Sequence, residues 1–123
     1  LYDDFLKDVA DDLKKSVEIA KNAGISDDKI ILDPGVGFGK DLEQNLAVTN
    51  HLDMLRKIGY PLLLGTSRKS MIGLTLELPV DMRLEGTLAT TVIGIMRGCS
   101  FVRVHDIKEN KRTIKMTEEI LKR

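Results

Sequence analysis

Amphipathic helical segments alternate with short apolar segments along this chain, and this alternation constrains the fold more than any other feature. Between residues 1 and 23, apolar side chains recur at three- and four-residue steps, which predicts a helix with one buried face. Gly24 follows as an expected C-terminal cap. Helices are also predicted over three further ranges: 42–58, 83–97 and 110–121.

Short apolar segments between the predicted helices have the composition of buried strands. They cover residues 29–33, 61–64 and 100–104. Strands this apolar are typical of a parallel sheet covered by helices on both faces. One helix followed by three βα units predicts an α/β fold, and because no Pro-rich or Gly/Ser-rich linker interrupts it, we predict a single domain over residues 1–123. A complete (β/α)8 barrel needs about 250 residues, so the 123 residues predict either an open sheet or part of a barrel.

Charge and hydropathy exclude several functional classes. Lys and Arg together number 19, as do Asp and Glu, so the chain lacks the strong positive field that attracts nucleic acid or anionic membranes. No apolar segment approaches the ~20 residues required to cross a bilayer, and the first residues show no export signal. The single cysteine, Cys99, excludes an internal disulfide. These features predict a cytoplasmic protein without nucleic-acid or membrane partners.

The first polar cluster, residues 33–40, has the sequence D-P-G-V-G-F-G-K and follows the first predicted strand. The spacing of its glycines fits neither G-x-G-x-x-G nor a P-loop, which excludes both common nucleotide-binding loops. Glycines such as Gly37 allow the backbone to approach a flat ligand that Phe38 can cover. Asp33 can accept paired hydrogen bonds from an amino-pyrimidine edge. The alternative is an Asp33 that only caps the following turn.

The second cluster, residues 65–70, has the sequence G-T-S-R-K-S and follows the second predicted strand. Arg68 supplies a planar fork of donors and Lys69 a compact ammonium, so the pair can hold a carbonyl, a carboxylate or a phosphate. Ser67 or Ser70 can cap a short helix that follows. The alternative is a surface turn whose two cations are simply solvated.

The third cluster, residues 103–106, ends the last predicted strand. Arg103 and His105 are two residues apart, so on a strand their side chains point to the same face. An anion such as pyrophosphate would satisfy both, and the loops after the last two strands of a barrel are a habitual phosphate site. The alternative is an internal ion pair of Arg103, for instance with Asp33 or Asp106, together with a neutral His105 hydrogen-bonded to backbone.

Several other residues have structural explanations. His51 has no metal-binding companion at helical spacing, so we expect a surface or edge histidine. Cys99 is expected to be a small packed residue rather than a nucleophile. The charged residues 108–112 are expected to form a solvated start of the last helix. Methionines are expected as core or subunit-interface residues: Met71, Met82, Met96 and Met116.

Four segments together carry a resemblance to a known family: residues 33–40, 65–70, 84–90 (L-E-G-T-L-A-T) and 103–106 (R-V-H-D). In this order and spacing they resemble the successive signatures of the dihydropteroate synthases, over essentially the whole chain. The resemblance implies a partial (β/α)8 TIM barrel whose last three strands are the ones predicted here. It also implies a transferase of folate biosynthesis, in which p-aminobenzoate displaces diphosphate from 6-hydroxymethyl-7,8-dihydropterin diphosphate to give 7,8-dihydropteroate.

The resemblance implies a role for each cluster. Asp33 would hold the 2-amino and ring N–H groups of the pterin, beside the backbone at Gly37. Lys69, Arg103 and His105 would be catalytic, Lys69 at the pterin carbonyl and the other two at the departing diphosphate. Ser67 and Phe38 would help form the p-aminobenzoate pocket, where sulfonamides compete. Arg68 would be a secondary ligand of the diphosphate.

The family places its Mg²⁺ ligand and further substrate contacts on amino-terminal strands, so no metal ligand is expected here, and the isolated chain is expected to have little or no turnover. Family members are homodimers, so a homodimer is expected. Two alternatives remain: the pterin-binding domain of a corrinoid-dependent methyltransferase, and a noncatalytic partial barrel that self-associates through its sheet edges.

Overall fold

The structure is a computed structural model that describes residues 2–123, with side chains described from Asp4 onward. Its elements follow in the order α1 (Tyr2–Asn22), η1 (Asp27–Lys29), α2 (Leu42–Asn50), α3 (Leu52–Arg56), β1 (Leu63–Leu64), α4 (Ser70–Leu76), η2 (Val80–Met82), α5 (Leu84–Met96), β2 (Phe101–Val102) and α6 (Ile107–Leu121). The fold is therefore α/β and mostly helical, in the predicted order.

Three chain segments lie side by side and parallel. β1 pairs with β2 in the register Leu63 to Phe101 and Leu64 to Val102, and on its other side a single parallel bridge joins Leu32 to Leu62. The predicted strands are in the right places, but the prediction of their length was wrong. The segment at 29–33 forms only the bridge at Leu32, because its beginning is taken up by the turn of η1.

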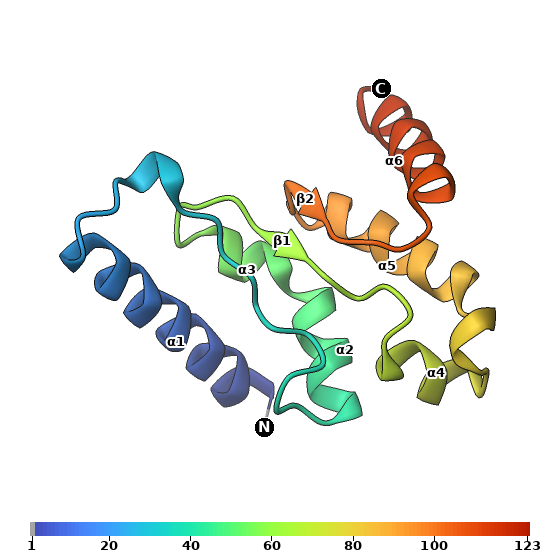
Figure 1. Ribbon diagram of the computed structural model, residues 1–123, viewed down its shortest axis with the longest axis horizontal. Helices are drawn as coiled ribbons and strands as arrows, with labels where there is room; N and C mark the ends of the chain where they lie inside the picture. Colours follow the sequence, from blue (N-terminus) through green and yellow to red (C-terminus); the bar gives the residue numbers. More distant parts are fainter. Residues whose placement is uncertain (1) are drawn as a thin grey trace.

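The helices form a row in which α2 contacts α1 and α5, and α5 contacts α6, as Figure 1 shows. α1 and α5 match the predicted helices closely. The predicted helix at 42–58 is instead interrupted at His51, whose φ of −120° and ψ of 31° end α2 before α3 begins. α6 begins at Ile107, three residues before the predicted start, and its Asn110 is buried rather than part of a solvated face.

The core lies between the helices and one face of the strand segments. α1 contributes Leu6 and Val17, α2 and α3 contribute Val48 and Leu52, and Leu64 of β1 is 1% exposed. The opposite face is uncovered among the described residues: Ile31 is 51% exposed and Phe101 is 47% exposed. The prediction of a sheet covered on both faces was therefore wrong for this part of the chain.

Gly94 allows α5 to pack closely on β1. A Cβ at this position would come within 2.6 Å of Leu64 Cδ2 and 2.9 Å of Cys99 Sγ. Overpacking costs about 1–3 kcal/mol, which exceeds the ~1 kcal/mol that Ala gains over Gly in a helix. We expect Gly94→Ala to lower the free energy of unfolding of the whole gene product by about 1–2 kcal/mol in urea titrations. Glu85→Gln, at an exposed position of α5, is the control and should change it by less than about 0.5 kcal/mol.

Candidate functional site

A cavity of about 430 Å³ lies where the three parallel segments end. Its lining comes from the loops that follow Leu32, β1 and β2: Asp33, Phe38, Gly65, Ser67, Lys69, Arg103, Val104 and His105. The carboxyl ends of parallel strands meet at one edge of a sheet, which is why residues far apart in sequence share this cavity. The structure thus brings one acidic and three basic side chains from the three predicted clusters to one place.

Lys69 is the central cation of this cavity. Its ammonium donates a hydrogen bond to the Val36 carbonyl and lies 4.9 Å from the centroid of the Phe38 ring, a cation–π distance. Partial burial lowers the pKa of Lys69; the Asp33 carboxylate opposes this shift, while the positive charge of Arg103 adds to it. Lys69 is therefore a partly desolvated cation placed to attract an electron-rich group.

Asp33 serves the following turn and also faces the cavity. Its Oδ1 accepts a hydrogen bond of 2.8 Å from the Gly35 N–H, so the capping alternative is part of its role. A carboxylate has about four acceptor sites, which leaves capacity for a ligand. Because the side chain is exposed and lines the cavity, Asp33 can accept donors from a bound heterocycle.

The glycine-rich loop is held in place by Asn45, a residue that sequence reasoning missed. Asn45 is 3% exposed, and its Oδ1 accepts a hydrogen bond of 2.8 Å from the Gly37 N–H. Gly37 has a φ of 90°, and a Cβ there would lie 3.1 Å from Lys69 Cδ. Gly37 is not among the residues that line the cavity, and its missing side chain lets Lys69 pass close to the loop. Asn45 lies inside the helix α2, and nothing in the sequence there indicated that it would hold the loop.

Ser67 positions His105. The Ser67 hydroxyl lies 2.8 Å from His105 Nδ1, and it also accepts a hydrogen bond of 3.1 Å from the His105 backbone N–H. Ser67 is buried, whereas Arg103 and His105 are exposed side chains that line the same cavity. Arg103 and His105 line the same cavity, but they follow β2 instead of lying on a strand, and Val104 between them lines the cavity too. The predicted alternation of a strand therefore does not extend to these residues.

Arg68 differs from its neighbours because it does not line the cavity. Its guanidinium pairs with Asp106, with an Nη2–Oδ1 distance of 2.8 Å. Its backbone φ is +58°, which turns its side chain out of the direction taken by Ser67 and Lys69. Because Asp106 pairs with Arg68, it is an unsuitable partner for Arg103. The alternative of an Arg103–Asp106 ion pair is therefore not supported.

Comparison with known proteins agrees with this arrangement. The family described as "Pterin binding enzyme" matches residues 1–105. The chain belongs to this family. Among curated pterin-binding relatives, the dihydropteroate synthase of Clostridium beijerinckii is 59% identical over 123 aligned residues, 99% of this chain and 46% of the relative. The chain thus spans less than half the length of the relatives it matches.

Solved structures give the same result. A dihydropteroate synthase from Clostridium difficile, determined in the presence of pteroic acid, superposes with a TM-score of 0.92 at 52% identity and covers 94% of this chain and 44% of its own. The Yersinia pestis enzyme with a pterin–sulfa conjugate superposes with a TM-score of 0.95 at 39% identity and covers 100% of this chain and 48% of its own. The pterin-binding family is thus supported by sequence and by fold.

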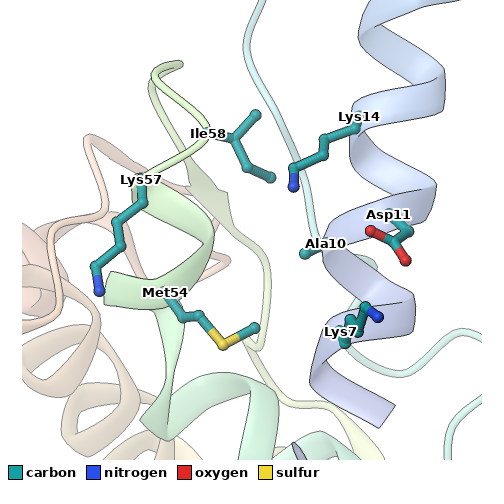
Figure 2. A pocket seen from close by; sticks show the side chains of 7 residues that line it. All are labelled: Lys7, Ala10, Asp11, Lys14, Met54, Lys57 and Ile58. Atoms are coloured by element: carbon teal, nitrogen blue, oxygen red, sulfur yellow. The ribbon is translucent and has the colours of Figure 1, made fainter. Parts of the chain in front are cut away.

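A second cavity, of about 460 Å³, lies between α1 and α3 with the residues that follow α3. Figure 2 shows Ala10 and Lys14 of α1 facing Met54 and Ile58 across this cavity, which Lys7 also lines. None of the predicted site residues lines it, and its lysines are solvent-exposed. The chemistry expected of a pterin-binding protein is therefore at the strand ends.

Residues 4–123, whose side chains are described, hold neither a metal-binding cluster nor a membrane-spanning helix. No group of three or more His, Cys, Asp or Glu side chains in this part of the chain is arranged to hold a metal ion. No helix in the same range combines the length and apolar character needed to cross a bilayer. His51 is exposed at the end of α2, as predicted.

Cys99 is a packed thiol, as predicted, and its burial has a consequence for stability at high pH. Desolvation raises the pKa of Cys99 to about 11, compared with about 8.5 for a free thiol. The folded state therefore holds a proton that the unfolded state releases, so stability falls as pH rises from about 8.5 to about 11. Between about pH 8 and about pH 10.5, we expect the free energy of unfolding to fall less in Cys99→Ala than in the parent protein. Equal falls in the two proteins would contradict the raised pKa of Cys99.

Proposed function

We propose that this chain is the carboxy-terminal part of a (β/α)8 barrel, a single pterin-binding domain fragment over residues 1–123 whose strand segments are the sixth, seventh and eighth of the barrel. The parallel neighbours Leu32, β1 and β2 support this, because they follow one another in chain order across the sheet. The exposed face at Ile31 and Phe101 also supports it, since a barrel would cover that face. Coverage of 46% of a relative fits the same interpretation.

We propose that the whole protein is a cytoplasmic dihydropteroate synthase. The observation that carries this proposal is the single cavity in which Asp33 shares a lining with Lys69, Arg103 and His105. The acid suits the N–H donors of a pterin, and the cations suit a diphosphate. The amine of p-aminobenzoate attacks the methylene carbon, a C–N bond forms as the C–O bond to diphosphate breaks, and the amine loses a proton.

The fixed cations lower the barrier because negative charge grows on the leaving diphosphate. Arg103 and His105 stabilise that charge, and Ser67 orients His105 through its Nδ1 contact. Lys69 contacts the pterin carbonyl near the incoming amine. Ser67 and Phe38 border the p-aminobenzoate position, where sulfonamides compete; the Yersinia pestis structure with a sulfonamide drug supports this part of the proposal.

Magnesium has no set of ligands in this part of the chain. Among residues 4–123, whose side chains are described, no carboxylate and histidine cluster fits the ion. We propose that any Mg²⁺ in the reaction is held by residues outside residues 1–123, and none of the steps above depends on it.

Turnover of the whole gene product tests this function. With pterin diphosphate and p-aminobenzoate it should release dihydropteroate and pyrophosphate, and sulfonamides should compete with p-aminobenzoate. The isolated 123-residue chain should show little or no turnover. An inactive whole gene product would refute the proposal, and methyl transfer from a pterin to a corrinoid would favour the methyltransferase alternative, for which the cations at Arg103 and His105 have no diphosphate to bind.

We also propose a homodimer formed through the carboxy-terminal helices. Met96 of α5 and Met116 and Ile120 of α6 are exposed apolar side chains on neighbouring helices, and such groups are typical of subunit interfaces. Light scattering of the whole gene product should give twice the mass of one chain, and a monomer would contradict this. Self-association of the isolated chain alone would instead reflect its uncovered sheet face.

A further inference from the structure

The backbone of Arg68 is held at both ends by the first turn of α5. Its N–H donates a hydrogen bond of 3.1 Å to Thr87 Oγ1, and its carbonyl accepts one of 2.9 Å from Arg83 Nη1. The Arg68 φ of +58° is a left-handed conformation that residues with a side chain rarely adopt. An unfavourable conformation persists only where its surroundings hold it, and these two hydrogen bonds are such a hold.

The same helix holds the loop at a second point. Thr66 Oγ1 lies 2.6 Å from Thr90 Oγ1, one turn along α5 from Thr87. Thr87 is fully buried, at 0% exposed. The Arg83 guanidinium packs so closely on α4 that a Cβ at Gly73 would meet it at 2.2 Å. The loop between β1 and α4 is therefore shaped by contacts that lie behind it, away from the cavity.

The residues on either side of Arg68 are the ones that face the cavity. Ser67 holds His105 and Lys69 is the central cation. A left-handed residue between them reverses the chain direction, so that both line the cavity while the Arg68 side chain leaves it to pair with Asp106. Loss of the hold on Arg68 would let both neighbours move.

We propose that Thr87 and Arg83 are positioning residues for this site: by fixing the backbone of Arg68 they aim Ser67 and Lys69 at the substrates. The inference rests on the proposed function for its kinetic consequence. Its structural part, the hold on Arg68, stands on the hydrogen bonds alone. The backbone of Arg68 is thus the part of the loop that Thr87 and Arg83 hold. Its guanidinium pairs with Asp106 and does not line the cavity.

Thr87→Val in the whole gene product tests the inference, because Val keeps the shape of Thr and removes only the hydroxyl. Thr87→Ser restores the hydroxyl. Thr91→Val is the matched control: Thr91 is buried on the same helix, and its hydroxyl donates to Asn110 Oδ1 at 2.7 Å, away from the loop. Three quantities are measured for each variant: kcat/KM, the melting temperature, and hydrogen exchange of the peptide containing residues 65–69.

We expect Thr87→Val to lower kcat/KM by about tenfold or more and to speed exchange in the 65–69 peptide. Thr87→Ser and Thr91→Val should stay within about threefold of the parent, even where Thr91→Val lowers the melting temperature as much as Thr87→Val does. Equal kcat/KM in Thr87→Val and Thr91→Val would overturn the inference. If the parent protein has no turnover, the proposed function fails, and hydrogen exchange in the 65–69 peptide then tests the hold on Arg68 by itself. Faster exchange in Thr87→Val than in Thr91→Val supports this hold, and equal exchange overturns it.

Discussion

Lys69→Met in the whole gene product should reduce kcat for dihydropteroate formation by about 100-fold or more, the usual effect of removing one fixed charge from a reacting centre. Met keeps the length and the apolar stem of Lys69, so its contact with the Phe38 ring can remain while the ammonium is lost. Steady-state kinetics with both substrates measures the effect. The lowered pKa of Lys69 further predicts that activity declines at a lower pH than an ordinary lysine would allow, because the cation loses its proton earlier.

A matched lysine separates this effect from a general loss of charge. Lys57 lines the cavity between α1 and α3, far from the strand ends, and is solvent-exposed. Lys57→Met should leave kcat within about twofold of the parent, as surface substitutions usually do. If Lys69→Met were equally active, the ammonium would have no part in the reaction and the proposed role of Lys69 would be wrong.

Asp33→Asn should weaken the binding of pteroic acid by roughly 10- to 150-fold, because hydrogen bonds to a charged acceptor contribute about 1.5–3 kcal/mol. The Asn oxygen can still accept the Gly35 N–H, so the turn that Asp33 caps should persist. The NH2 group of Asn, however, is a hydrogen-bond donor, so it would face the N–H groups of the pterin without accepting from them. Calorimetric titration of the whole gene product with pteroic acid measures the change.

Asp41 provides the control for this substitution. Its side chain caps α2 by accepting a hydrogen bond of 2.8 Å from the Gln44 N–H, and it does not line the cavity. Asp41→Asn preserves a good N-cap and should leave pteroic acid binding unchanged. Equal binding by the Asp33→Asn variant and the parent would show that Asp33 serves only its own turn.

The helices were predictable because their signals are local. The three- and four-residue spacing of Leu6, Val9, Leu13 and Val17 requires one buried face, and that face packs into the core. The interruption at His51 was not predictable, since the apolar pattern continues across it and only the backbone changes direction. Strand lengths were overestimated for a related reason: pairing requires a partner strand, and here each segment meets its neighbour over only one or two residues.

The site was partly predictable for a topological reason. Parallel strands deliver whatever follows them to one edge, so Asp33, Lys69 and Arg103 could be expected together from their places in the sequence. Arg68 shows the limit of such reasoning. Adjacent residues in a motif need not share a direction, and its left-handed backbone is fixed by Thr87, nineteen residues later in the chain, which no local pattern reveals.

The central claim is that one cavity receives a pterin on its acidic side and a diphosphate on its basic side. A crystal structure of the whole gene product with pteroic acid and pyrophosphate bound tests it most directly. We predict the pterin ring hydrogen-bonded to Asp33 and pyrophosphate in contact with Arg103 and His105. A pterin ring bound away from Asp33, or pyrophosphate bound at a different surface, would contradict the claim.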